Sequence, residues 1–189
     1  MNLENRKIVL ASASPRRKEI ISLISSDVVI RPAECDETLP EGIGAKEAVE
    51  YLSNIKNDAA RRASAEDEII ITADTVVAVD NKILGKPENK EDARRMISLL
   101  SGKTHQVFTG VTIFADGKKV TFSEKTDVTF LALSEEEIEK YISSDEPYDK
   151  AGSYGIQGKG GLLVKCISGD YFNVVGLPAA RLNRELSAL

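Results

Sequence analysis

The sequence has 189 residues, of which 42% are hydrophobic and 29% charged, and its formal net charge is −5. This length and composition are typical of a single globular domain, residues 1–189, that buries its core without a disulfide or a structural metal. An acidic chain with 5% aromatic residues and no tryptophan lacks the basic stripe and stacking platform of a nucleic-acid-binding protein. We therefore expect no nucleic-acid partner.

The cysteines and the N-terminus indicate a cytoplasmic protein. Cys35 and Cys166 are far apart and stand in no metal-ligand spacing, which is typical of reduced thiols in a reducing compartment. The segment Met1 to Lys7 is polar, and the apolar run after it is too short for a signal sequence or a membrane span. We expect no association with a membrane.

The first half of the chain is predicted to alternate strands and helices. Ser14 suits a helix N-cap and Pro15 the first helical position, while the β-branched stretch 69–79 is typical of a central strand. Asp80-Asn81 is a plausible two-residue turn to a second strand. The predicted strands are 7–11, 28–31, 69–79 and 82–84, and the predicted helices are 15–24 and 45–64.

The second half adds a long hairpin and further helices. Asn89 can begin a helix that Gly102 ends, and Ser134 with Glu137 forms a capping box for another. The predicted strands are 106–114, 120–133 and 162–167, and the predicted helices are 89–100, 134–143 and one after Pro178. Hairpins mixed with helices predict an α/β fold, in which a mixed sheet is flanked by helices.

The first candidate site is the segment from Ser12 through Ser14 to Arg16 and Arg17, between a strand and a helix. The N-terminus of a helix attracts anions, and two arginines in its first turn are unfavourable unless an anion binds there. Guanidinium groups and backbone amides can converge on the oxygens of a polyphosphate. The alternative is a helix start whose arginines point into water.

The second candidate is Asp74, because a carboxylate in a buried strand is costly without a compensating cation or hydrogen bonds. If Val79 pairs with Lys82 across the turn, Thr75 faces Lys86, which places Lys86 beside Asp74. An aspartate and a lysine at one strand end can bind a divalent metal and a phosphate together. The alternative is a structural ion pair or backbone contact.

The third candidate is the glycine-rich run 150–161, in which Gln157 is the side chain suited to reading a base edge. The run matches neither a P-loop nor a dinucleotide fingerprint, and a plain surface loop is an equal alternative. Taken singly, Glu37 and Lys56 are expected to be solvated. The single histidine, His105, is expected to pack at the start of a strand rather than to catalyse.

Together these motifs resemble the Maf family of nucleotide pyrophosphatases. The matching segments extend over nearly the whole chain, and their order is more specific than any one motif. They are 10–17, 36–37, 73–75, 86–87, 100–105, 109–111, 149–152, 154–158 and 176–178. The resemblance implies a twisted mixed sheet of the Maf/ITPase-like type, with two lobes around a nucleotide-binding cleft, and commonly a homodimer.

The resemblance also implies the chemistry: Mg²⁺ or Mn²⁺ as cofactor, a nucleoside triphosphate as substrate, and attack of water at the α-phosphate. Asp74 matches the proton acceptor or a metal ligand, and Glu37 the other metal ligand. The phosphate-binding positions match Ser12, Arg16, Arg17, Lys56 and Lys86, and those that set base preference match Arg16, Thr75 and Gln157. The Gly-Ile-Gln-Gly form is similar to the branch acting on dTTP and UTP, rather than on 7-methyl-GTP.

Two questions stay open on the sequence. The physiological substrate is either a canonical pyrimidine triphosphate or a modified one removed from the nucleotide pool. The rival function is a nucleotide-sensing regulator of cell division or septum formation, which would use the same phosphate site and act through a protein partner.

Overall fold

The computed structural model describes residues 6–189, so most of the polar start predicted for Met1 to Lys7 lies outside the described residues. One mixed sheet has the strand order β2-β1-β3-β5-β6-β7, with β4 also paired to β3. The strands are β1 (Ile8–Leu10), β2 (Val28–Ile30), β3 (Ile69–Val79), β4 (Lys82–Leu84), β5 (Thr104–Ala115), β6 (Lys118–Phe130) and β7 (Val164–Ser168). The predicted α/β class with a mixed sheet is confirmed.

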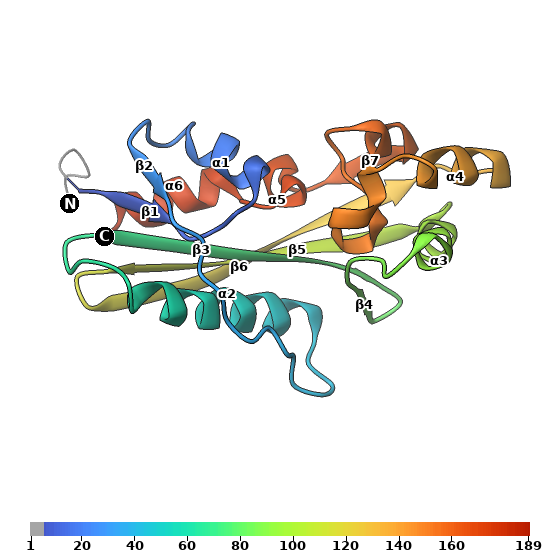
Figure 1. Cartoon of the computed structure of the whole chain (residues 1–189). Coiled ribbons are helices and arrows are strands. Elements are labelled where there is room, and N and C mark those ends of the chain that lie inside the picture. The colour runs from blue at the N-terminus through green and yellow to red at the C-terminus, as the bar shows by residue number, and fades with distance from the viewer. Residues whose placement is uncertain (1–5) are drawn as a thin grey trace.

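The helices cover both faces of this sheet (Figure 1). They are α1 (Pro15–Ile21), α2 (Ala45–Arg61), α3 (Lys90–Leu100), α4 (Glu135–Ile142), α5 (Tyr171–Val175) and α6 (Ala179–Ser187). Three 3-10 turns, η2 (Glu146–Asp149), η3 (Ala151–Ser153) and η4 (Lys159–Leu163), lie between α4 and β7. The glycine-rich run is therefore a series of tight turns and not an irregular loop.

Four predicted boundaries and one missing helix need correction. Helix α2 ends at Arg61 and not at residue 64. Helix α1 ends at Ile21 and not at residue 24, and β6 ends at Phe130 and not at residue 133. The last strand begins at Val164, because residues 159–163 form η4. Helix α5 was not predicted: its five residues are too few for a periodic pattern, and Asp170 is its N-cap, whose side chain accepts a hydrogen bond from the backbone of Phe172.

The core on one face of the sheet consists of two clusters that share the long strands β3 and β5. The first packs Ile69, Ile71 and Ala73 against α1, α5 and α6, and the second packs Val77 and Val79 against α3 and α4. Helix α2 lies alone on the opposite face (Figure 1). The two clusters are the cores of two lobes, and long strands connect them.

His105 belongs to the second cluster. Its Nε2 lies 2.7 Å from the hydroxyl of Tyr154, and its ring packs edge-on against Phe130 and Tyr154. Burial lowers the pKa of His105 to about 4, so the ring is neutral at neutral pH. The expectation that this histidine packs inside the fold is confirmed.

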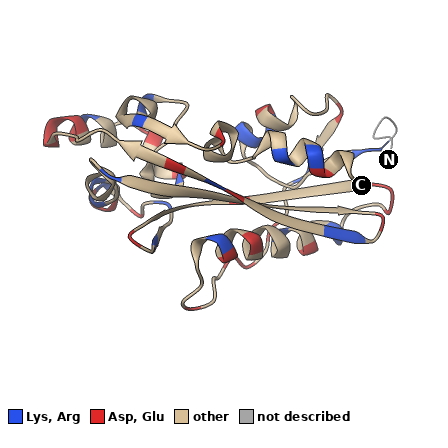
Figure 2. Ribbon diagram, turned by 180° about the vertical axis from the view of Figure 1, so that it is seen from behind, with Lys and Arg blue, Asp and Glu red and all other residues tan. Residues whose placement is uncertain are grey.

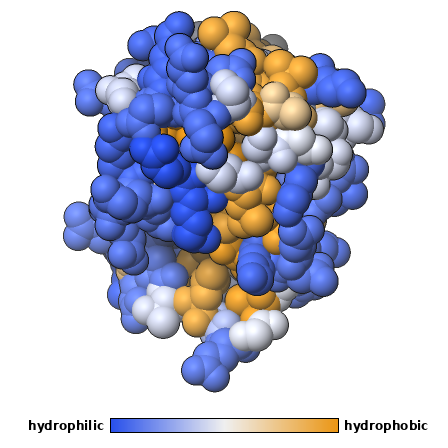
Figure 3. All heavy atoms as spheres, turned by 90° about the vertical axis from the view of Figure 1, so that its right-hand side faces the viewer, coloured by the Kyte–Doolittle hydropathy of each residue, from blue (hydrophilic) through white to orange (hydrophobic). Residues whose placement is uncertain are grey.

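Charged residues of both signs occur along the chain from residue 6 to 189. Acidic and basic residues are interspersed over the helices and strands (Figure 2). The end where α3, α4 and β7 lie carries apolar surface between hydrophilic side chains (Figure 3), and Leu162 and Leu131 are among the exposed large apolar residues of the chain. Among residues 6–189, no helix is long and apolar enough to cross a membrane.

Helix α2 approaches β5 most closely at Gly110. A Cβ atom at this position would overlap the backbone carbonyl of Val49, and backbone atoms cannot move aside as a flexible side chain can. We expect Gly110→Ala to lower the free energy of unfolding by about 1–3 kcal/mol, the usual cost of overpacking, measured by urea denaturation. Gly85→Ala is the matched control, since a Cβ there meets nothing within 4 Å. Equal midpoints for both variants would contradict the close packing of α2.

Candidate active site

The candidate site lies where one edge of β3 is not covered by a neighbouring strand. Strand β5 pairs with the other edge from Ile70 to Ala78. On the open side, β1 pairs only as far as Ile71 and β4 begins only at Val77. The interval between β1 and β4 holds Asp74, so a ligand at this edge can reach side chains on both faces of the sheet.

Asp74 points to the face of the sheet that α2 covers. Its Oδ1 lies 2.5 Å from Nζ of Lys56, and both side chains are 13% exposed. The same Lys56 nitrogen lies 3.0 Å from Oε2 of Glu37 in the loop after β2. One largely buried ammonium group therefore joins the two carboxylates. The expectation that Lys56 is solvated is wrong, whereas Glu37, 54% exposed, is solvated and also paired with Lys56.

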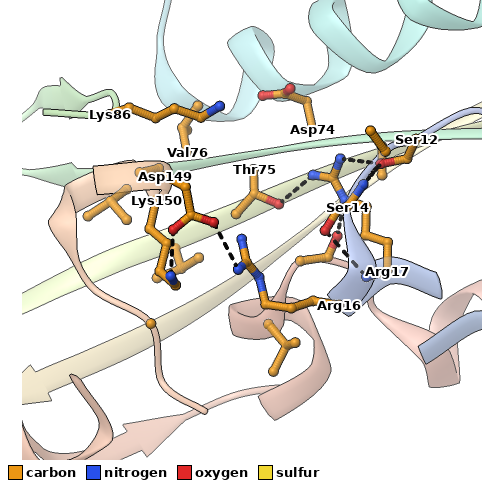
Figure 4. A pocket seen from close by; sticks show the side chains of 18 of the residues that line it. Ser12, Ser14, Arg16, Arg17, Asp74, Thr75, Val76, Lys86, Asp149 and Lys150 are labelled. Atoms are coloured by element: carbon orange, nitrogen blue, oxygen red, sulfur yellow. Dashed lines mark hydrogen bonds and ion pairs between the residues drawn. The ribbon is translucent and has the colours of Figure 1, made fainter. Parts of the chain in front are cut away.

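Lys86 follows β4 and lines the same cleft. The predicted register of Val79 with Lys82 is confirmed, although the pairing ends at Leu84. Figure 4 shows Lys86 extending toward Asp74 along the same side of β3. The direct cation partner of Asp74 is nevertheless Lys56, which sequence reasoning could not place because it comes from a helix 18 residues earlier.

Arg17 occupies the opposite side of β3 from Asp74 (Figure 4). Its guanidinium group donates hydrogen bonds to the carbonyl of Gly176 at 2.8 Å, to Oγ1 of Thr75 at 3.1 Å and to Oγ of Ser12 at 3.4 Å. Burial lowers the pKa of Arg17, while the charge of Asp74 raises it. The alternative in which Arg17 points into water is therefore wrong.

The helix start around Ser14 has the geometry of an anion site. The Ser14 side chain accepts a hydrogen bond from the backbone N–H of Arg17, and the Ser14 N–H donates to Oγ of Ser12. Arg16 extends across the cleft to Asp149, with 3.4 Å between Nη1 and Oδ2 (Figure 4). Helix dipole, backbone amides and two arginines thus converge at the end of β1.

The opposite wall of the cleft comes from the segment after α4. Gln157 lines the cleft and is exposed, as a side chain that reads a ligand must be. Nζ of Lys150 lies 2.5 Å from Oδ1 of Asp149 and 2.7 Å from the carbonyl of Glu146. The sequence contained no sign of a role for Glu146, which precedes the glycine-rich run, and gave Asp149 and Lys150 no individual role.

These walls enclose a cleft of about 1110 Å³, large enough for a nucleotide. Its lining combines a helix N-terminus, arginines and lysines with a buried aspartate and an exposed glutamine. Within residues 6–189, no three His, Cys, Asp or Glu side chains gather as a ready metal cluster. The fold and the lining define an α/β protein with a cleft for a phosphorylated ligand.

Comparison with known proteins identifies the family. A model of the Maf-like protein family matches residues 7–189, so the chain belongs to the Maf family. A dTTP/UTP pyrophosphatase of Bacillus cereus is 52% identical over 96% of this chain and 94% of its own length, and one of Bacillus anthracis matches equally well. The Ham1 protein of Staphylococcus aureus, 16% identical, covers 66% of this chain and 72% of its own with a TM-score of 0.46, too low to support an inference.

Because Arg17 makes three hydrogen bonds, we expect its substitution to lower stability more than the same substitution of Arg16. A lysine has no planar fork, so Arg17→Lys would leave buried oxygen acceptors unpaired. We expect a loss of about 1–3 kcal/mol in the free energy of unfolding, together with weaker binding of tripolyphosphate in calorimetry. Arg16→Lys is the control for stability, since Arg16 makes one solvent-accessible ion pair. Equal unfolding curves for the two variants would contradict the framework role of Arg17.

Proposed function

We propose that this chain hydrolyses dTTP and UTP to the nucleoside monophosphate and pyrophosphate. The observation that supports this best is a carboxylate, Asp74, at an uncovered strand edge beside a helix N-terminus that carries two arginines. A water nucleophile and a polyphosphate leaving group need these two elements side by side. The two Bacillus relatives, with their printed activity, point to the same reaction.

In this proposal the cations around β3 hold the triphosphate. Ser12 and Ser14 with the amides of the helix start contact phosphate oxygens, and Arg16 adds a mobile guanidinium from the cleft mouth. Lys86 approaches from the other side of β3 (Figure 4), the side on which Lys56 is paired with Asp74. Charge develops on the β-phosphate as the bond from the α-phosphorus to the bridging oxygen breaks, and these groups stabilise it on the departing pyrophosphate.

Asp74 is proposed as the group that orients and deprotonates the attacking water. The water oxygen forms a bond to the α-phosphorus, and its proton passes to the Asp74 carboxylate. Before a substrate binds, Lys56 holds that carboxylate in place, with its Nζ 2.5 Å from Oδ1 of Asp74. When Lys56 turns to a phosphate oxygen, Asp74 is left free to accept the proton.

The carboxylates of Asp74 and Glu37 fit the divalent metal that the family implies. Both approach the Lys56 nitrogen within 3.0 Å, so both can approach one cation, and two carboxylates completed by substrate phosphates are a usual set for Mg²⁺. A hard cation such as Mg²⁺ or Mn²⁺ bound there would neutralise phosphate charge.

Base preference is proposed to depend on Gln157, Thr75 and Arg16. Gln157 offers an amide that can donate to and accept from a pyrimidine edge. Thr75 acts differently, because its hydroxyl is already bonded to Arg17 and to Thr109 at 2.9 Å. Thr75 therefore contributes by holding Arg17, and Gln157 is the side chain left to read the base.

A homodimer in the cytoplasm remains a prediction from the resemblance and the sequence. Leu162, 78% exposed, is an apolar side chain that a second copy could bury.

The proposed reaction is tested by measuring pyrophosphate release from dTTP, UTP, CTP, GTP and 7-methyl-GTP with Mg²⁺, Mn²⁺ or EDTA. We expect metal-dependent release from dTTP and UTP, with the monophosphate as the other product. Release from 7-methyl-GTP alone would keep the reaction and overturn the proposed reading of the base by Gln157. Nucleotide binding without any release would favour the rival function of a nucleotide sensor.

Asp74→Asn tests the proposed proton acceptor. The amide keeps the size of the side chain but cannot accept the proton, so we expect turnover of dTTP to fall about 10²–10⁴-fold while circular dichroism stays unchanged. Asp80→Asn is the matched control at the end of the same strand, where the exposed carboxylate pairs with Lys103 outside the cleft. Undiminished turnover by Asp74→Asn would remove Asp74 from the reaction.

A further inference from the structure

Glu146 lies at the start of η2, and its side chain reaches the end of the glycine-rich segment. Its Oε2 accepts a hydrogen bond from the backbone N–H of Lys159 at 2.8 Å, and its Oε1 accepts one from Gly160 at 2.8 Å. The hydroxyl of Tyr141 in α4 donates to Oε1 at 3.2 Å. Three donors thus converge on one carboxylate, and bonds to a charged acceptor are about twice as strong as neutral ones.

The glycines of this segment are explained by the approach of Glu146 and Lys150. A Cβ at Gly158 would overlap the Glu146 carboxylate, and one at Gly155 would lie 2.6 Å from Cε of Lys150. At Gly160 a Cβ would lie 2.6 Å from the backbone carbonyl oxygen of Gly155 and 2.8 Å from the hydroxyl of Tyr141. None of the three has a positive φ. A side chain at Gly155 or Gly158 would therefore force Lys150 or the Glu146 carboxylate to move, without any strain from a positive φ.

Gln157 lies in the sequence between two glycines, Gly155 and Gly158, that pack on charged side chains. On its N-terminal side, Gly155 packs on Lys150, and on its C-terminal side Gly158 packs on Glu146. The exposed Gln157 side chain lines the cleft, although it makes no contact with Glu146 that would hold it there directly. The path of the backbone through Gly155 and Gly158 therefore decides where the Gln157 amide lies.

We propose that Glu146 is the positioning residue for base recognition: its carboxylate fixes the turn that presents Gln157 to the nucleobase. This role rests on the proposed pyrophosphatase function and deepens it. Glu146 does not contact the reacting phosphate in this role. Its loss should therefore change which base is accepted more than how fast the phosphate bond breaks.

The kinetic test compares Glu146→Ala and Glu146→Gln with Asp145→Ala, a neighbour that loses the same charge from an exposed position. We expect Glu146→Ala to lower the ratio of kcat/KM for UTP over CTP about tenfold to a hundredfold, mainly through KM, because small misplacements have effects of this size. Glu146→Gln keeps one acceptor oxygen and should fall between. An unchanged ratio, or an equal loss for UTP and CTP, would overturn the proposal.

Amide hydrogen exchange tests the same role without relying on turnover. In the unsubstituted protein, the N–H groups of Lys159 and Gly160 should exchange slowly, since both are bonded to Glu146. Glu146→Ala should release both amides, whereas Asp145→Ala should leave them protected. Unchanged protection in Glu146→Ala would overturn the proposal. If the unsubstituted protein releases no pyrophosphate, the proposed function and the base-recognition role fail, while exchange still decides whether Glu146 holds the turn.

A double-substitution cycle adds a further check. Gly158→Ala forces a methyl group against the Glu146 carboxylate, so it should lower the preference for UTP when Glu146 is present. With alanine at position 146 the obstacle is gone, and Gly158→Ala should have little further effect. Independent, additive effects of the two substitutions on the ratio would overturn the coupling between them.

Discussion

The ion pair between Lys56 and Asp74 is the interaction on which the cleft depends. Asp74 lies in a long and largely apolar strand, where an isolated carboxylate would be costly to bury. The cation that pairs with Asp74 comes from α2, so this helix must lie at a fixed position over β3. Asn57, which follows Lys56 in this helix, fixes that position by donating hydrogen bonds to the backbone carbonyls of Ile70 and Thr112.

A ligand can reach this ion pair through the interval between β1 and β4, where the edge of β3 is uncovered. A continuous neighbouring strand would have covered the edge of β3, and Asp74 would be a purely structural residue. Because the interval lies between the two core clusters, each lobe contributes one wall: α1 belongs to the first cluster, and the turns η2 to η4 adjoin the second. The paired strands β3 and β5 contribute to both clusters and so connect the two walls.

Local signals in the sequence were sufficient for most elements of the fold. The N-cap at Ser14, the capping box of Ser134 and Glu137, and the β-branched run of β3 each depend on neighbouring residues, and each is present. The sequence does not predict helix α5, because five residues are too few to show a helical periodicity of apolar positions. The 3-10 turn η4 was taken for strand because its two leucines precede β7 directly.

The site was predicted less completely, because its contacts are distant in sequence. Motif resemblance selected Arg17 and Lys56, but not the bonds that Arg17 makes to Gly176 or the ion pair that Lys56 makes to Asp74. Glu146 carried no local signal at all. Its importance follows from two amides that come 13 and 14 residues later. Such contacts are decided by how the chain folds back, which no short window of sequence contains.

The charges of the cleft explain how an acidic protein can favour an anionic ligand. Lys56 is paired with Asp74 and Glu37, and Arg16 is paired with Asp149. Carboxylates hold these two cations in place. A polyphosphate that binds must exchange partners with the carboxylates. In the proposed mechanism, such an exchange at Lys56 would free Asp74, so that binding of the phosphates would also release the carboxylate.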